Sequence, residues 1–119
     1  MDRLLQRRDF LAAAKAPAVS TPGIVVQGRK RNDEGPARVG FTCTKKLGNA
    51  VMRNRIRRRI KEAARLTLPQ VAHSEYDYVL IGRMAAEKRA FEDLRKDIIS
   101  AVTKLHAGLG SARNREKPS

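Results

Sequence analysis

The sequence predicts a single domain of the α/β (α+β) class, in which helices pack on a central sheet. Short β-branched and apolar runs alternate along the chain with longer segments of helical periodicity. The length of 119 residues leaves no room for a second unit of ordinary size, and 41% hydrophobic residues can line one core. We expect one domain over residues 1–108 and a disordered basic tail over residues 109–119, which lack periodicity.

The first half of the chain predicts one short helix and two strands. Residues 7–15 form the helix, because the helix-breaking Pro17 follows soon after its end. Residues 23–29 contain a β-branched run, and residues 38–44 alternate apolar side chains with small or polar ones. The charged, turn-forming residues 30–36 predict an exposed connection, so we expect the two strands to form an antiparallel hairpin.

The second half predicts two longer helices separated by a central strand. Asn49 can cap the first helix, whose pattern continues to about Leu66, before Pro69. Residues 76–82 form an apolar run without alternation, which is typical of a strand covered on both faces. Residues 87–106 repeat apolar side chains at steps of three and four, so we expect an amphipathic helix packed on the sheet.

The charge of the chain is strongly positive and unevenly placed. Lys and Arg number 26 against 12 Asp and Glu, and the resulting net charge of +14 implies a polyanionic partner. The 21 residues from Lys45 to Arg65 hold nine basic residues and one acid, Glu62, so +8 of the net charge lies there. Nucleic acid is therefore the expected partner.

The helix predicted after Asn49 has an apolar face and a cationic face. The apolar stripe, which we expect to face the sheet, consists of Met52, Ile56, Ile60, Ala63 and Thr67. The adjacent i, i+4 ridge of like charges consists of Arg53, Arg57, Lys61 and Arg65. These charges repel one another, which favours a binding surface over a merely stabilising one. A membrane-binding helix is the weaker alternative, because the stripe is narrow and has no aromatic residue.

Residues 38–58, RVGFTCTKKLGNAVMRNRIRR, closely resemble the signature of the bacterial ribonuclease P protein subunit, centred on Arg53-Asn54-Arg55. The resemblance also covers residues 7–10 and 76–83 with the helix that follows, so it spans about residues 3–106. It implies a two-layer sandwich with a central mixed sheet and a left-handed βαβ crossover through the basic helix. This is the ribosomal protein S5 domain 2-like fold.

The resemblance implies that the chain joins a large catalytic RNA. With Mg²⁺, bound mainly by the RNA, this RNA removes the 5′ leader from precursor tRNA by hydrolysing one phosphodiester bond. The protein is then the non-catalytic component of an endoribonuclease, with no catalytic or metal-ligating residue of its own. The RNA-binding residues implied are Lys45, Lys46, Asn49, Arg53, Asn54, Arg55, Arg57, Arg58, Lys61 and Arg65.

The resemblance also implies a second surface, a cleft between the first helix and the sheet that takes the single-stranded leader. Phe10 is the aromatic residue on which leader bases can stack, with Arg7 and Arg8 beside it. The expected partners are therefore the catalytic RNA and precursor tRNA, with no membrane and no obligate protein partner. Phe41, by contrast, is expected in the core.

A cytoplasmic location is expected from three features of the sequence. The N-terminus lacks the apolar stretch of a signal peptide, and no run approaches the length of a membrane span. The single cysteine, Cys43, cannot form an internal disulfide and falls in an apolar stretch, so we interpret it as a buried thiol.

Two alternatives to the subunit hypothesis are a protein-only nuclease and a plain structural RNA-binding protein. The first needs clustered carboxylates or an acid and a base held together. We interpret the available acids as solvated surface, namely Asp33, Glu34, Glu75, Asp77, Asp93 and Asp97. His73 and His106 are interpreted as structural or incidental. A small ribosomal protein would share the charge, size and compartment, and only the signature separates it from the subunit.

Overall fold

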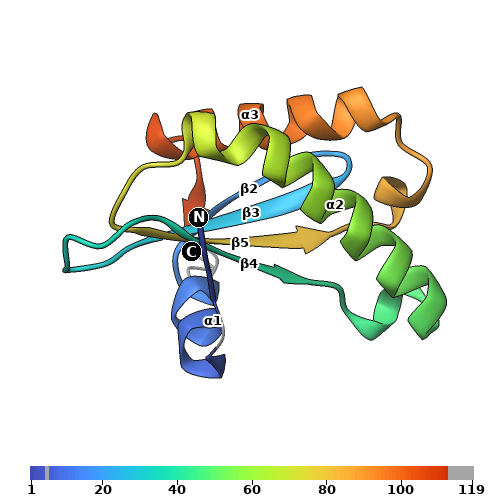
Figure 1. Cartoon of the computed structure of the whole chain (residues 1–119), viewed down its shortest axis with the longest axis horizontal. Helices are drawn as coiled ribbons and strands as arrows, with labels where there is room; N and C mark the ends of the chain where they lie inside the picture. Colours follow the sequence, from blue (N-terminus) through green and yellow to red (C-terminus); the bar gives the residue numbers. More distant parts are fainter. Residues whose placement is uncertain (5, 113–119) are drawn as a thin grey trace.

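The computed structural model describes residues 1–4 and 6–112, which form one mixed sheet with helices on both faces (Figure 1). The strands are β1 (Asp2–Arg3), β2 (Pro17–Ser20), β3 (Ile24–Lys30), β4 (Arg38–Thr42), β5 (Tyr76–Gly82) and β6 (Ser111–Ala112). The helices are α1 (Arg7–Ala14), α2 (Ala50–Val71) and α3 (Phe91–His106). Short 3₁₀ helices cover Lys45–Leu47 and Met84–Glu87. The α+β class expected from the sequence is confirmed.

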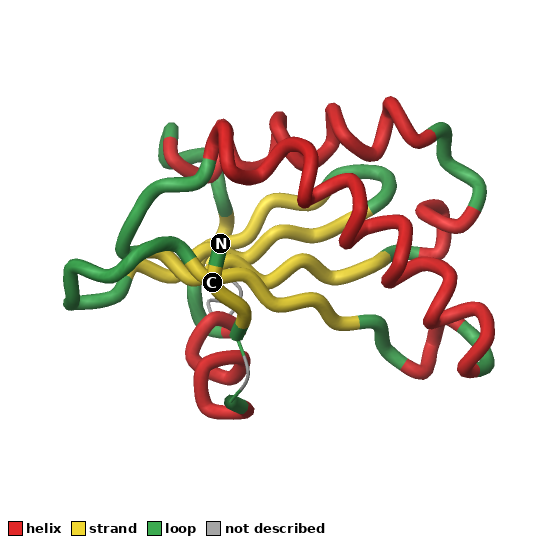
Figure 2. The backbone as a smooth tube through the Cα atoms, in the orientation of Figure 1, coloured by secondary structure: helices red, strands yellow, loops and turns green. Residues whose placement is uncertain are grey.

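The sheet has the strand order β1-β4-β5-β3-β2-β6, and its two faces carry different helices. Helices α2 and α3 lie on one side of the sheet and α1 on the other (Figure 2). The main core lies under α2 and α3, where buried side chains of β3 and β5 meet those of the helices. A smaller cluster of Leu4, Ala13 and Val79, with Phe10 and Ile81 against it, lies under α1.

Strand β5 occupies the centre of the sheet, as its apolar sequence predicts. It pairs antiparallel with β3 from Ile24↔Gly82 to Lys30↔Tyr76 and parallel with β4 from Arg38↔Asp77 to Thr42↔Ile81. The hairpin expected between the strands now seen as β3 and β4 is therefore wrong, because β5 lies between them. β5 carries apolar side chains for both faces, with Tyr78 and Leu80 in the main core and Val79 and Ile81 in the cluster under α1, which suits the central position.

The hairpin partner of β3 is β2, a strand that the sequence pattern did not reveal. Val19 pairs with Val26 and Ala18 with Gln27 in an antiparallel register. β2 is only four residues long and begins with Pro17, so it shows too little alternation to be recognised. On its other side β2 pairs with Ser111–Ala112, so the segment 109–119, expected to be disordered, contains a paired strand. The rest of the predicted tail, residues 113–119, lies outside the described residues.

Helix α2 connects the parallel neighbours β4 and β5, and this is the βαβ crossover that the resemblance implies. The arrangement in Figure 1 fits the left-handed sense.

The two ends of α2 differ in how well the sequence predicts them. The predicted cap is confirmed, because the Met52 N–H donates to Asn49 Oδ1 at 2.9 Å. The predicted end is wrong: α2 continues through Pro69 to Val71. Leu68 is 1% exposed, so burial of the last turn outweighs the hydrogen bond that Pro69 cannot make.

No helix among the residues described is both long and apolar enough to cross a membrane.

Two acids expected on the solvated surface are buried instead. Asp77 is 0% exposed and lies on β5 directly opposite Arg38 of β4 and Arg29 of β3. Its carboxylate accepts hydrogen bonds from Arg38 Nη2 at 2.7 Å and from Arg31 Nη1 at 2.7 Å. Asp97 on α3 is 6% exposed and is paired with the Arg89 guanidinium. The partners of Asp77 are 39 and 46 positions away, so spacing along the chain did not reveal these pairs.

The two histidines pack at the ends of α2 and α3, around the fully buried ring of Tyr78. The Tyr78 hydroxyl accepts the backbone N–H of His73 at 2.8 Å and lies 2.6 Å from His106 Nε2. The His73 and His106 rings stack with centroids 3.5 Å apart. Burial raises the pKa of Tyr78 to about 12, and burial together with the His73 charge lowers the pKa of His106. The structural role expected for both histidines is confirmed.

Asp77→Asn is expected to destabilise the fold strongly. The change keeps the shape of the side chain but removes the buried counter-charge that Arg31 and Arg38 share, which costs about 3 kcal/mol of unfolding free energy. Burial raises the pKa of Asp77, but its bonds to Arg38 and Arg31 outweigh this and lower the pKa overall. The carboxylate therefore stabilises the fold at pH values above the pKa that Asp77 has in the unfolded chain. This stabilisation is lost as the pH falls through the lower pKa that Asp77 has in the folded protein. Urea unfolding at pH 7 and at acid pH measures both effects.

Asp33→Asn is the matched control for this prediction. Asp33 also pairs with Arg31, at 3.0 Å, but its side chain is 58% exposed. Asp33→Asn should lower the unfolding free energy much less than Asp77→Asn, because water solvates the exposed charges at this position. Equal losses for the two variants would contradict the structural role given to Asp77.

Candidate nucleic-acid interface

The turn between β4 and α2 exposes two lysines beside the start of the helix. Lys45 and Lys46 lie in a 3₁₀ turn and are exposed, while Leu47 between them and the helix is buried and anchors the turn. Gly48 has a φ of 114°, which a residue with a side chain rarely adopts, so glycine is required at this point. The predicted site residue Asn49 uses its side-chain oxygen to cap α2. This turn therefore presents Lys45 and Lys46 at the helix N-terminus.

Three arginines of α2 have partners within the protein. Arg55 Nη1 lies 2.9 Å from Glu87 Oε2, and Arg65 pairs with Glu62. Arg59 donates hydrogen bonds to the backbone carbonyls of Ala86, Glu87 and Arg89. These residues belong to the second 3₁₀ helix and to the short link between it and α3. Arg59 therefore fastens the segment before α3 to α2.

The other cations of the basic segment 45–65 have no ion pair within the described part of the chain. We call these residues the unpaired cation face: Lys45, Lys46, Arg53, Arg57, Arg58 and Lys61. Arg57 Nη1 donates to the Asn54 side-chain oxygen at 3.3 Å. Arg53 Nε is buried and has no hydrogen-bond partner among the residues described. Charge left without a partner in the protein is available to an anionic ligand.

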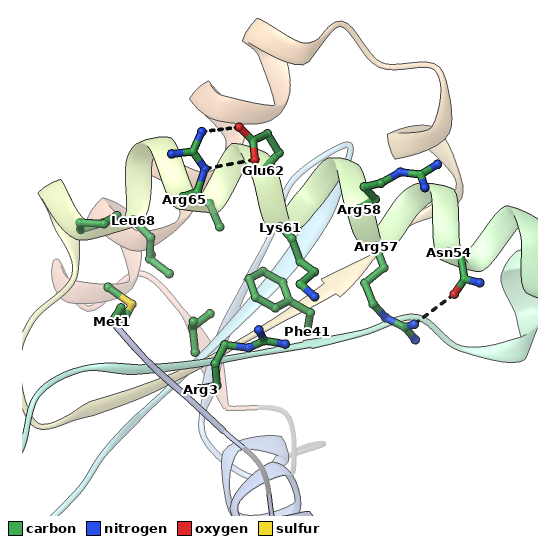
Figure 3. Close-up of a pocket in the computed structure, with 13 residues that line it drawn as sticks. Met1, Arg3, Phe41, Asn54, Arg57, Arg58, Lys61, Glu62, Arg65 and Leu68 are labelled. Atoms are coloured by element: carbon green, nitrogen blue, oxygen red, sulfur yellow. Dashed lines mark hydrogen bonds and ion pairs between the residues drawn. The ribbon is translucent and has the colours of Figure 1, made fainter.

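A groove of about 850 Å³ runs between α2 and the β1–β4 edge of the sheet (Figure 3). We call it the helix–edge groove. Its main apolar lining residues are Val39, Phe41, Ala64 and Leu68. Its polar lining residues are Arg3, Asn54, Arg57, Arg58, Lys61, Glu62 and Arg65. The groove thus brings together five of the predicted RNA-binding residues.

Phe41 and Arg3 are the two residues of this groove that sequence reasoning missed. Phe41, expected in the core, is only half-buried. Arg3 lies on the two-residue strand β1, which pairs with β4 and is too short to show a strand pattern. The Arg3 guanidinium carbon lies 5.9 Å from the centre of the Phe41 ring. The position of Phe41 on a near-edge strand accounts for its exposure.

The residues predicted to bind the leader do not share one hollow. Phe10 is half-buried in the small cluster under α1, and its ring lies so close to Gly40 that a Cβ there would be 2.6 Å from Phe10 Cζ. Arg7 and Arg8 are exposed. Arg8 lines a second hollow of about 500 Å³ along α1, together with Asp9, Arg29 and Arg38 among others. Phe10 does not line this hollow.

The side chains of the interface offer cations and hydrogen-bond donors. Within the described residues, no group of three or more His, Cys, Asp or Glu side chains could hold a metal ion. Cys43 is buried near the helix, and burial raises the pKa of its thiol despite the nearby charges of Arg57 and Arg53. A raised pKa disfavours the reactive thiolate at neutral pH. The arrangement can therefore bind and orient phosphates.

Comparison with known proteins gives one consistent family. The family model Ribonuclease P matches residues 1–106. The ribonuclease P protein component of Ruegeria pomeroyi is 52% identical over 108 residues, covering 87% of this chain and 86% of that protein. The corresponding protein of Caulobacter vibrioides is 50% identical over 109 residues, covering 91% of this chain and 73% of that protein.

Solved structures agree in fold. The RNase P protein of Thermotoga maritima matches with a TM-score of 0.67 and 26% identity, covering 98% of this chain and 100% of that chain. The RNase P protein of Staphylococcus aureus matches with a TM-score of 0.72 and 24% identity, covering 88% and 95%. The matched residues include the signature and all of α2. The chain therefore belongs to the ribonuclease P protein family, whose members are the protein subunit of the ribonucleoprotein that removes 5′ leaders from precursor tRNA.

Proposed function

We propose that this chain binds the catalytic ribonuclease P RNA through the unpaired cation face and so supports cleavage of precursor tRNA. One observation carries the proposal: six cations of the basic segment 45–65, five of them in the family signature, lie together on and beside α2 without an ion pair in the described part of the protein. Retaining so many unpaired like charges costs stability, and a phosphate backbone removes that cost.

The proposed contacts with the RNA differ according to the bonds that each side chain already makes within the protein. Arg53, Arg57, Arg58 and Lys61 meet phosphates directly, while the Asn54 amide adds hydrogen bonds. Lys45, Lys46 and the N-terminal turn of α2 bind a further phosphate, because the end of a helix favours negative charge. Arg55 and Arg65 join the interface by exchanging or sharing their internal partners Glu87 and Glu62. Asn49 contributes by holding the helix end in place.

The RNA performs the hydrolysis in this proposal, with Mg²⁺ as its cofactor. The described residues of the chain offer no cluster of metal ligands, so the ions belong to the RNA. The protein lowers the concentration of Mg²⁺ needed, because its cations replace part of the counterion atmosphere around closely packed phosphates. The compartment proposed is the cytoplasm.

The precursor tRNA is the second proposed partner, bound through its leader near α1. The exposed part of the Phe10 ring gives one base a surface for stacking, and the exposed Arg7 and Arg8 attract the leader backbone. Arg8 reaches the 500 Å³ hollow along α1, which Arg29 and Arg38 also line. This surface lies on the opposite face of the sheet from α2, so leader and catalytic RNA do not compete for the same residues.

Lys61→Ala is expected to weaken binding to the catalytic RNA in a salt-dependent way. If Lys61 neutralises one phosphate, its loss lowers the slope of log K against log salt concentration by roughly 0.7 to 0.9. Titration of the RNA at several salt concentrations measures this slope. Lys104→Ala on the exposed face of α3 removes the same charge away from the interface and should leave the slope unchanged. An unchanged slope for Lys61→Ala would show that this face of α2 remains in solvent.

Reversing the charge at two positions tests the function itself. The chain should stimulate precursor tRNA cleavage by the catalytic RNA of the same organism at low Mg²⁺. Arg57→Glu combined with Arg58→Glu should reduce that stimulation by at least about tenfold, because like charges then face each other at the interface. The matched control combines Lys96→Glu with Lys104→Glu on α3 and should retain most of the stimulation.

The same cleavage assay separates the subunit from a plain structural RNA-binding protein. Tight RNA binding without any stimulation by the unaltered chain would favour the structural protein. Cleavage by the protein alone would contradict both hypotheses.

A further inference from the structure

The helix–edge groove has an apolar floor beneath its cationic rim. Val39 and Phe41 from β4 and Ala64 and Leu68 from α2 supply this floor. Phosphates are bound by charge and hydrogen bonds and need no apolar surface. The floor therefore indicates a ligand that has an apolar face as well as negative charge.

The aromatic side chain in the groove is Phe41. It lies on β4, whose outer neighbour is the two-residue strand β1, so its ring is left half-buried. Figure 3 shows this ring close to the side chains of Arg3 and Lys61, which line the same groove. The Arg3 guanidinium carbon is 5.9 Å from the ring centre. A flat ring flanked by cations is the arrangement on which proteins stack single-stranded bases, with the cations on the backbone.

The rim supplies the remaining recognition elements. Arg57 and Lys61 have no ion pair within the described residues, and both line the groove. The Asn54 oxygen accepts a hydrogen bond from Arg57 at 3.3 Å, which leaves its NH₂ group to donate. An amide beside a stacked base can hydrogen-bond to the base edge. Charge, stacking surface and edge recognition thus meet in one groove.

We propose that the helix–edge groove receives one unpaired nucleotide of the catalytic RNA, with its base stacked on Phe41 and its flanking phosphates on Arg57 and Lys61. This inference rests on the proposed function, because it assumes that the catalytic RNA lies along α2. A base inside a duplex is stacked on both sides, so the nucleotide comes from a loop, bulge or junction. The groove then fixes the position of the RNA along the helix, which charge alone does not do.

Phe41→Leu tests the stacking contact while keeping an apolar side chain in the groove. Base stacking on an aromatic ring is strong enough that Kd for the catalytic RNA should rise about tenfold. The salt slope should stay that of the unaltered chain, because no phosphate contact is lost. Phe91→Leu is the matched control, since it makes the same change at another half-buried ring, on α3 and outside the groove. It should change neither quantity.

A second measurement uses the absence of tryptophan from the chain. Phe41→Trp places a single indole in the groove, and a base stacked on it should quench its fluorescence when the catalytic RNA is added. Leu109→Trp, at a side chain that is 67% exposed beyond α3, should not be quenched.

An unchanged Kd for Phe41→Leu, with no quenching at position 41, would overturn the nucleotide proposal. That result would leave the salt slope of Lys61→Ala and the cleavage assay untouched, so the proposed function would stand. Absence of stimulation by the unaltered chain would instead overturn the proposed function.

Discussion

Burial of one face of α2 against the sheet determines where the charges of this helix lie. Ile56 and Ile60 are 0% and 1% exposed, and they hold the helix in one rotation about its own axis. With this rotation fixed, Arg53, Arg57 and Lys61 follow one another along the flank of the helix beside the β4 edge. The parallel crossover from β4 to β5 requires a long connection, and α2 provides it along the sheet. The fold thus presents a cationic surface as a consequence of its connectivity.

The basic residues of α2 have two different physical roles. Arg59 donates to three backbone carbonyls and so stabilises the segment that leads into α3. Arg57, Arg58 and Lys61 make no ion pair among the residues described and add repulsion to the folded state. The same distinction appears at the sheet, where Asp77 neutralises Arg31 and Arg38 within the protein. Arginine content alone therefore does not measure the size of the RNA-binding surface.

Much of the fold was predictable because its elements have strong local patterns. The cap at Asn49, the central strand over residues 76–82 and the apolar stripe of α2 all lie where the sequence places them. The β3–β4 hairpin was wrong because strand adjacency depends on which strand best fills the middle of the sheet, and turn residues do not report this. The end of α2 was wrong because burial of Leu68 compensates for Pro69.

The candidate site was predictable where its residues are consecutive in the signature. Lys45, Lys46 and the arginines of α2 come from one segment, so their spacing and the family resemblance identify them. Phe41 and Arg3 were missed because they join the groove from the sheet edge and from the N-terminus. The burial of Asp77 depends on arginines 39 and 46 positions away. Such long-range pairs are fixed by strand register, which the sequence pattern did not reveal.

The division of roles within α2 can be tested with one pair of variants, Arg57→Ala and Arg59→Ala, measured for both unfolding free energy and affinity for the catalytic RNA. We expect Arg59→Ala to lower the unfolding free energy by about 1–3 kcal/mol, because it leaves three part-buried carbonyls without their donor, and to keep the salt slope of binding. Arg57→Ala should weaken RNA binding and leave the unfolding free energy unchanged or slightly higher. The opposite pattern, with Arg57 required for stability and Arg59 for RNA binding, would contradict the division.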